Sequence, residues 1–197
     1  RQRQMCIRDR STSVASPDLE PSEFFRDREG LLVEAGRLGP VLDLACGQGR
    51  HSLAAARLGL PVLSMDRDER ALRTLQRIAP PLVHCVRTDL EAGLGIPVAP
   101  SSLGAVMVFR FLFRPLAQSI VEVLRPGGLL LYETFTTHQR KLGQGPNNPA
   151  FLLEPNELPR LFGALCPVAY QEVVTPEPRP AALARLVARK RANAQTA

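Results

Sequence analysis

One segment constrains the fold of this chain more than any other: residues 41–52, with the sequence VLDLACGQGRHS. Its first half is a short apolar run that carries one acid, Asp43, and such a run is typical of a buried strand. Gly47 and Gly49 follow at once, and a helical pattern begins directly behind them. Glycine permits a sharp turn and lets a ligand approach the main chain without a Cβ in the way. The segment therefore predicts a strand, a ligand-binding turn and a helix in immediate succession.

The rest of the chain repeats this alternation of short apolar strands and helices. It predicts an α/β fold, a Rossmann-like doubly wound sheet that is seven-stranded and mostly parallel, with an antiparallel C-terminal strand. Ligands on such sheets bind beyond the carboxyl ends of the strands. The last segment, 181–190, is interpreted as a strand, although its leucines also fit a helical period. The expected strands are 41–45, 61–65, 82–86, 105–109, 129–133, 165–174 and 181–190, and the expected helices are 18–38, 50–59, 68–78, 115–124 and 155–163.

Length and composition predict one globular domain. The chain has 197 residues, 45% of them hydrophobic, and no apolar run approaches the ~20 residues that cross a bilayer. We expect the domain over 18–190, a disordered or non-native leader over 1–17 that lacks the apolar core of a signal peptide, and a flexible basic tail over 191–197. The four cysteines form no C-x-x-C pair, which indicates reduced thiols in the cytoplasm and predicts no metal site.

The positive charge is concentrated at the two ends of the chain. The net charge is +6, and residues 1–10 and 185–197 each contain four cations. The remaining body is close to neutral, whereas a nucleic-acid-binding face gathers lysine and arginine on the folded body. A small-molecule partner is therefore favoured over nucleic acid, and the basic tail is the feature that keeps RNA as an alternative.

Three acids stand at the ends of successive predicted strands: Asp43, Asp66 and Asp89. Each of them alone would be interpreted as a helix cap or a turn residue, but their shared position favours a binding site. An acid about 20 residues after a glycine-rich turn is placed to grip ribose hydroxyls, which suits Asp66. Carboxylates beside that turn repel a pyrophosphate and attract a sulfonium or an ammonium. The pattern, with Ser52 in place of a third glycine, counts against a dinucleotide cofactor.

Four segments, VLDLACGQGRHS, VLSMDRD, VRTDLE and LRPGGLLLYETF, resemble in order and spacing the motifs of class I S-adenosylmethionine-dependent methyltransferases. The turn at 47–50, together with Ser52, is similar to that of the tellurite-resistance methyltransferase group within this class. The resemblance extends over about residues 20 to 190 and implies S-adenosylmethionine as the cofactor. A single compact domain with no added recognition module favours a small-molecule or inorganic acceptor. The cofactor-binding residues that the resemblance implies are Asp43, Ala45, Gly47, Gly49, Asp66, Arg67, Asp89, Leu90 and Phe109.

The catalytic residues are left largely open. Arg110 and Glu133 border the expected acceptor site and are the only catalytic candidates, whereas His51 is expected to pack or cap a helix. Methyl transfer from a sulfonium is an in-line displacement, so the protein mainly supplies proximity and alignment. Two alternatives remain: a nicotinamide-dependent oxidoreductase, and a non-catalytic adenosylmethionine-binding module with an RNA or protein partner.

Overall fold

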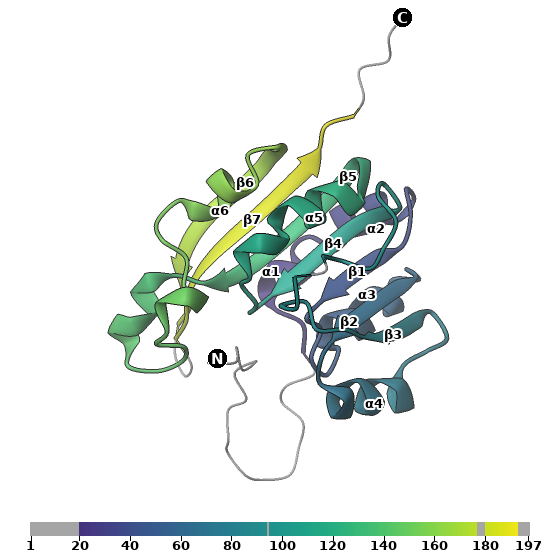
Figure 1. Ribbon diagram of the computed structural model, residues 1–197, viewed down its shortest axis with the longest axis horizontal. Helices are drawn as coiled ribbons and strands as arrows, with labels where there is room; N and C mark the ends of the chain where they lie inside the picture. Colours follow the sequence, from purple (N-terminus) through teal and green to yellow (C-terminus); the bar gives the residue numbers. More distant parts are fainter. Residues whose placement is uncertain (1–19, 94, 177–179, 193–197) are drawn as a thin grey trace, which may run out of the picture.

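A seven-stranded sheet runs through the molecule in the order β3-β2-β1-β4-β5-β7-β6 (Figure 1). The computed structural model describes residues 20–93, 95–176 and 180–192. The first five strands along the chain pair in parallel, and β7 is antiparallel to both of its neighbours, β5 and β6. The expected doubly wound sheet is therefore confirmed. The strands are β1 (Val41–Leu44), β2 (Val62–Asp66), β3 (Val83–Arg87), β4 (Leu103–Phe109), β5 (Leu124–Phe135), β6 (Leu165–Val174) and β7 (Ala182–Lys190).

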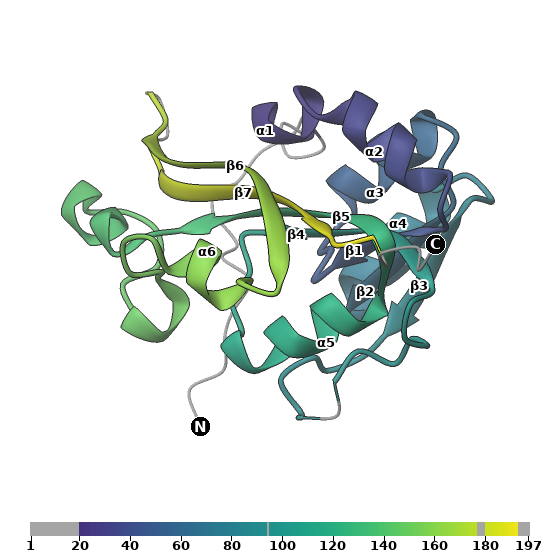
Figure 2. The same cartoon turned by 90° about the horizontal axis from the view of Figure 1, so that it is seen from above.

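Helices cover both faces of this sheet. Figure 2 shows α1, α2 and α3 above the sheet and α5 and α6 below it. Each face has its own cluster of buried side chains, because the central strands point alternate residues to opposite sides. The α-helices are α1 (Glu23–Arg26), α2 (Glu29–Gly36), α3 (Arg50–Arg57), α4 (Glu69–Ile78), α5 (Ala117–Val123) and α6 (Glu157–Leu161), and the 3-10 helices are η2 (Arg114–Leu116), η3 (Thr137–Leu142) and η4 (Pro149–Phe151).

The turn between β1 and α3 is tightly determined. All four residues of β1 are buried, because the strand lies between β2 and β4. Ala45 follows with a φ of 58°, a left-handed conformation that strains a residue with a Cβ. Gly49 has a φ of 79°, and a Cβ on it would lie 2.5 Å from the side chain of Leu75. Only glycine fits this position, so the sequence fixes the point at which α3 begins.

The segment 182–190 is a strand, which settles the choice between strand and helix. Ala184, Leu186 and Ala188 join the cluster on the α5 and α6 face, whereas Val187 joins the cluster on the opposite face. This alternation has a period of two, as in a strand. Both faces of β7 are buried, so apolar residues occur at odd and even positions alike, and the sequence pattern imitates a helix.

Some element boundaries differ from those predicted. The helix expected over 18–38 is broken at Asp27, because Ser22 caps a separate first turn by accepting from the N–H of Phe25. No helix was expected between 133 and 155, but Thr137–Leu142 forms η3. Residues 1–17 and most of the 191–197 tail lie outside the described residues. Within the described ranges, no helix is long and apolar enough to cross a membrane.

Candidate functional site

A cavity opens at the carboxyl ends of the parallel strands. Ala45 follows β1, Asp66 ends β2, Arg110 follows β4, and Phe135 ends β5. Counted to its open mouth and including the solvent there, the empty space is about 560 Å³. The carboxyl ends of parallel strands meet at one edge, so residues far apart in the sequence line the same cavity. The lining also includes Arg67, Thr88, Asp89, Leu90, Glu91, Phe111, Leu112, Thr134, Pro146 and Phe151.

Asp66 is fixed by the backbone before any ligand arrives. Its Oδ2 accepts from the N–H of Gly47 at 2.7 Å, and its Oδ1 accepts from the N–H of Asp68 at 2.8 Å. The carboxyl is almost fully buried, with 2% of the residue exposed. Each carboxylate oxygen can accept a further hydrogen bond, so the group can still bind a pair of hydroxyls. Asp66 therefore joins the glycine-rich turn to the cavity.

Two acids after β3, Asp89 and Glu91, line the cavity together with Asp66. Asp89 accepts from the N–H of Glu91 at 3.0 Å, which closes a tight turn around Leu90. Arg67 pairs with Glu91 at 3.2 Å. Burial raises the pKa of Glu91 from its usual value, and the charge of Arg67 opposes that rise. Asp66, Asp89 and Glu91 thus carry three carboxylates here against the single cation of Arg67, and we call this part of the lining the acidic half.

Asp43 lies behind the turn rather than in the cavity lining. Its Oδ2 accepts from the hydroxyl of Ser52 at 2.6 Å, and Ser52 in turn accepts from the hydroxyl of Ser64 at 2.7 Å. Burial raises the pKa of Asp43 to about 6. The chain of hydrogen bonds ties β1, α3 and β2 together, which gives Ser52 a structural role. Gly47 and Gly49 also stand outside the lining, so direct cofactor contacts of these three residues stay predictions.

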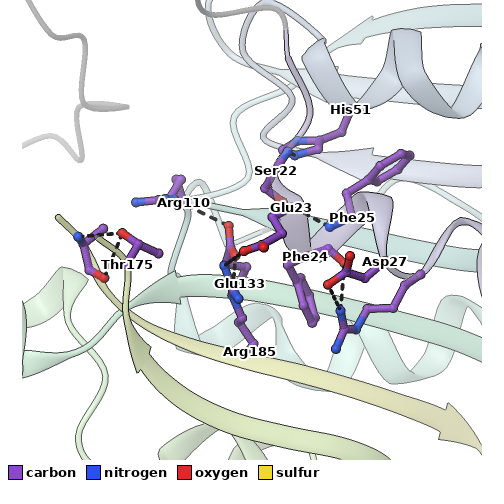
Figure 3. A network of polar contacts seen from close by, with 12 residues as sticks. Ser22, Glu23, Phe24, Phe25, Asp27, His51, Arg110, Glu133, Thr175 and Arg185 are labelled. Carbon is purple, nitrogen blue, oxygen red and sulfur yellow. Dashed lines mark hydrogen bonds and ion pairs between the residues drawn. The ribbon is translucent and has the colours of Figure 1, made fainter. Parts of the chain in front are cut away.

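Arg110 enters the cavity beside a buried ion pair (Figure 3). Glu133 is completely buried, and its Oε2 accepts from Nε of Arg185 at 2.8 Å. Its Oε1 lies 3.7 Å from Nε of Arg110, which is too far for a hydrogen bond, and both of these atoms are buried without a partner. The guanidinium of Arg110 lies 4.5 Å above the ring of Phe135. Arg110 thus faces the cavity, whereas Glu133 supports it from behind.

The side chain of Phe109 turns away from the cavity. Its ring stacks on His51, with centroids 3.6 Å apart and planes 18° from parallel. His51 accepts from the N–H of Ser22 at 3.2 Å, and burial holds its pKa well below the usual value. The histidine is therefore neutral and packs under α1, as the sequence indicated. The predicted contact of Phe109 with a cofactor is not supported by this placement.

Arg114 holds one wall of the cavity. It donates to the carbonyl oxygens of Ala150 at 3.0 Å and Leu152 at 2.9 Å, and its Nη2 reaches Glu157 at 2.9 Å. The guanidinium of Arg114 is thus held by contacts within the chain rather than left for a ligand. Arg114 instead fixes η4, whose Phe151 lines the cavity.

Sequence reasoning missed part of the site. Glu91 and Thr88 flank the predicted Asp89, so their adjacency to the strand end was a usable signal. Phe151 and Pro146 come from a segment whose proximity to the sheet has no sequence signature. Arg185 is a similar case, since only the pairing of β7 with β5 places it opposite Glu133. Among the described residues, no cluster of three or more acidic, histidine or cysteine side chains could hold a metal ion.

Comparison with known proteins finds one family match over part of the chain and several solved structures with a similar fold. Residues 41–128 match a family described as a methyltransferase domain, and no curated protein matches the chain in sequence. A putative S-adenosylmethionine-dependent methyltransferase from Listeria monocytogenes is similar in structure, with a TM-score of 0.67 and 17% identity over 85% of this chain and 98% of that one.

Two further structures share the fold. TehB from Haemophilus influenzae has a TM-score of 0.63 and 23% identity, over 82% of this chain and 62% of its own. A geranyl diphosphate C-methyltransferase from Streptomyces coelicolor, solved with S-adenosyl-L-homocysteine, has a TM-score of 0.60 and 13% identity over 84% of this chain and 77% of that one. The shared feature is the architecture that forms the cavity at the carboxyl ends of the strands.

Proposed function

We propose that this chain, with its methyltransferase domain match over residues 41–128, binds S-adenosylmethionine in the acidic half of the cavity. The methyl group is then transferred to a small acceptor held beside Arg110 and Phe135. The enzyme class rests on the domain match and on the fold. The observation that carries the placement of the cofactor is Asp66, a carboxylate fixed by two backbone N–H groups at the end of β2 and facing the cavity.

The residues of the acidic half fit this cofactor in charge and shape. Asp66 can accept from both ribose hydroxyls, and Asp89 can accept from an exocyclic amine of the base. Leu90 and Leu112 supply apolar walls for the adenine ring. The cofactor carries a sulfonium and an ammonium, and the surplus of carboxylates attracts that positive charge. The same surplus would repel a pyrophosphate, which argues against a nicotinamide cofactor.

The protein's own part in the reaction is positioning. S-adenosylmethionine supplies an activated methyl group, so the chain has to align an acceptor in line with it and keep water out. Phe111, Phe135 and Phe151 make the acceptor side of the cavity apolar. Glu133 is held by Arg185 and stands outside the lining, so we assign it a supporting role and propose no general base. Arg110 is assigned to acceptor binding rather than to proton transfer.

The acceptor is proposed to be a small molecule in the cytoplasm. The cavity is enclosed by side chains of this one chain, and the free thiols of Cys46 and Cys85 suit a reducing compartment. The likeness of the turn at 47–50 to the tellurite-resistance group, together with the similarity to TehB, adds inorganic oxyanions to the acceptors worth testing.

The proposal is tested by titration calorimetry on the full chain with S-adenosylhomocysteine and with NAD. We expect micromolar binding of the first and no binding of the second, because the acidic half accepts a cation and repels a pyrophosphate. Binding of NAD alone would overturn the proposal and make Asp66 a dinucleotide ribose ligand. If S-adenosylhomocysteine binds, a screen with labelled methyl donor separates an enzyme from a non-catalytic binding module.

A further inference from the structure

The two ends of the cavity carry opposite charge. The acidic half has Asp66, Asp89 and Glu91 against Arg67. At the other end, Arg110 is the only charged residue that the described part of the chain contributes to the lining. The pair of Glu133 and Arg185 supports it from behind. Arg185 is engaged by Glu133 at 2.8 Å and by Glu23 at 3.9 Å, so Arg110 is the guanidinium of this group that faces the cavity. A cationic cofactor in the first half therefore leaves a site for an anion in the second.

Arg110 has hydrogen-bonding capacity that the protein does not use. Within the described part of the chain its side chain donates no hydrogen bond, although it is about one-third exposed, toward the cavity. Burial lowers the pKa of Arg110 to about 10, so the guanidinium remains charged at neutral pH. Its backbone has a φ of 57°, an uncommon conformation for arginine that is held by the bond from its N–H to the carbonyl of Glu133 at 2.8 Å. Such strain at a cavity wall is typical of ligand-binding residues.

The surroundings of Arg110 restrict the anion further. Phe111, Phe135 and Phe151 line the same end, so most of the ligand surface there must be apolar. The ring of Phe135 lies against one face of the guanidinium and leaves its edge for a planar partner. A dianion would place a second negative charge near Glu133 with no further cation to balance it. The balance of charges thus favours a single negative charge.

We propose that the methyl acceptor is a small organic monoanion, a carboxylate on an apolar or aromatic body, and that its carboxylate pairs with Arg110. This inference rests on the proposed function, because it takes the acidic half as the place of the cofactor. Arg110 acts as the specificity-determining residue, and Phe135 and Phe151 hold the apolar body. Glu133 and Arg185 are positioning residues that keep the guanidinium of Arg110 at the cavity wall.

The test uses three probes of similar size on the full chain: 3-phenylpropanoate, its neutral amide 3-phenylpropanamide, and phenyl phosphate. Their affinities are measured by titration calorimetry with and without saturating S-adenosylhomocysteine. We expect the carboxylate to bind about tenfold or more tightly than either of the other two, since only its single negative charge matches the one guanidinium that faces this end of the cavity. Equal affinity for carboxylate and amide, preference for the phosphate, or no binding of the carboxylate would overturn the proposal, and none of these results depends on a variant.

Two matched variants assign the effect to a residue. R110Q should weaken binding of 3-phenylpropanoate about tenfold and leave the affinity for S-adenosylhomocysteine unchanged. R140Q removes the same charge from an exposed position on η3 and should change neither. Unchanged carboxylate affinity in R110Q would sink the assignment. If S-adenosylhomocysteine fails to bind, the proposed function is overturned. The titration of 3-phenylpropanoate in the absence of S-adenosylhomocysteine still decides whether Arg110 binds an anion.

Discussion

In the half of the cavity formed after β2 and β3, Asp66 and Asp89 are held by backbone N–H groups, whereas in the half formed by β4 and β5, Arg110 is held by a second layer of buried side chains. The backbone bonds of the acidic half arise within a few residues of each strand end or from the neighbouring turn. The support of Arg110 comes from Arg185, far along the chain on β7. A site held by the backbone is built into the fold, whereas a site held by side chains can be altered one residue at a time.

This difference predicts in which half of the cavity the residues can be substituted without disturbing the fold. The acidic half is determined by the strand ends and the glycine-rich turn, so changing it disturbs the fold as well as the ligand. The opposite half depends on a few ionic and aromatic contacts, namely those of Glu133, Phe135 and Phe151. The acceptor can therefore differ between proteins of similar architecture while the cofactor stays the same. Three substitutions measure how far the two halves are independent.

The largest effect is expected from E133A. It leaves the buried Arg185 with only the exposed Glu23, 3.9 Å away, and Arg110 without its support. Breaking a buried ion pair from one side costs about 3–5 kcal/mol of unfolding free energy. Urea denaturation would measure the loss, and E122A on the exposed face of α5 is the control. If the two halves are independent, E133A binds S-adenosylhomocysteine with the affinity of the wild type at temperatures well below the melting temperature of the variant. A stability loss under about 1 kcal/mol would contradict the assigned role of Glu133.

D66A comes next and tests the other half. Two hydrogen bonds from ribose hydroxyls to a carboxylate contribute about 1.5–3 kcal/mol each, so the affinity for S-adenosylhomocysteine should fall on the order of 100-fold or more. The chain should still fold, with some loss of stability because the N–H groups of Gly47 and Asp68 lose their acceptor. D68A is the matched control: it removes a neighbouring acid that caps α4 and should leave the affinity unchanged. Normal binding in D66A, measured by calorimetry, would remove Asp66 from the cofactor site.

The smallest effect concerns Asp43, the acid that lies behind the turn rather than in the cavity lining. Burial raises its pKa to about 6, above the ~3.9 of an unfolded chain, so the folded state keeps a proton that the unfolded state loses. The raised pKa therefore adds at most about 3 kcal/mol to the free energy of unfolding. This contribution is present below about pH 4 and is lost as the pH rises through 6.

D43N removes this dependence. We expect it to gain about 1–3 kcal/mol over the wild type near pH 8 and less near pH 4, in urea denaturation across that range. The charges that bear on Asp43 are Arg50, which lowers its pKa, and Asp66, which raises it. A parallel pH profile in the two proteins would show that the carboxyl is already ionised at low pH, and that burial does not control it.

The sequence alone determined the parallel half of the sheet and the order of acids at its edge. The strands at 41–45 and 61–65 and the turn at 47–49 carry their information locally, in apolar runs and in glycines that favour the left-handed backbone of the turn. Strand ends follow from these patterns, and parallel pairing brings Asp66 and Asp89 to one edge. The position of Asp66 and Asp89 in the acidic half was therefore predictable, with Glu91 the main omission.

Only the tertiary structure decided the rest. It showed that 182–190 is a strand, that Asp43 binds Ser52 behind the turn, and that Phe109 stacks on His51 instead of facing the cavity. It also brought Arg185 to Glu133 and Phe151 to the cavity wall. These are contacts between segments that lie far apart in the chain, and their energies depend on packing and burial after folding. Local patterns record which residues favour a strand or a turn, but not which distant side chains they meet.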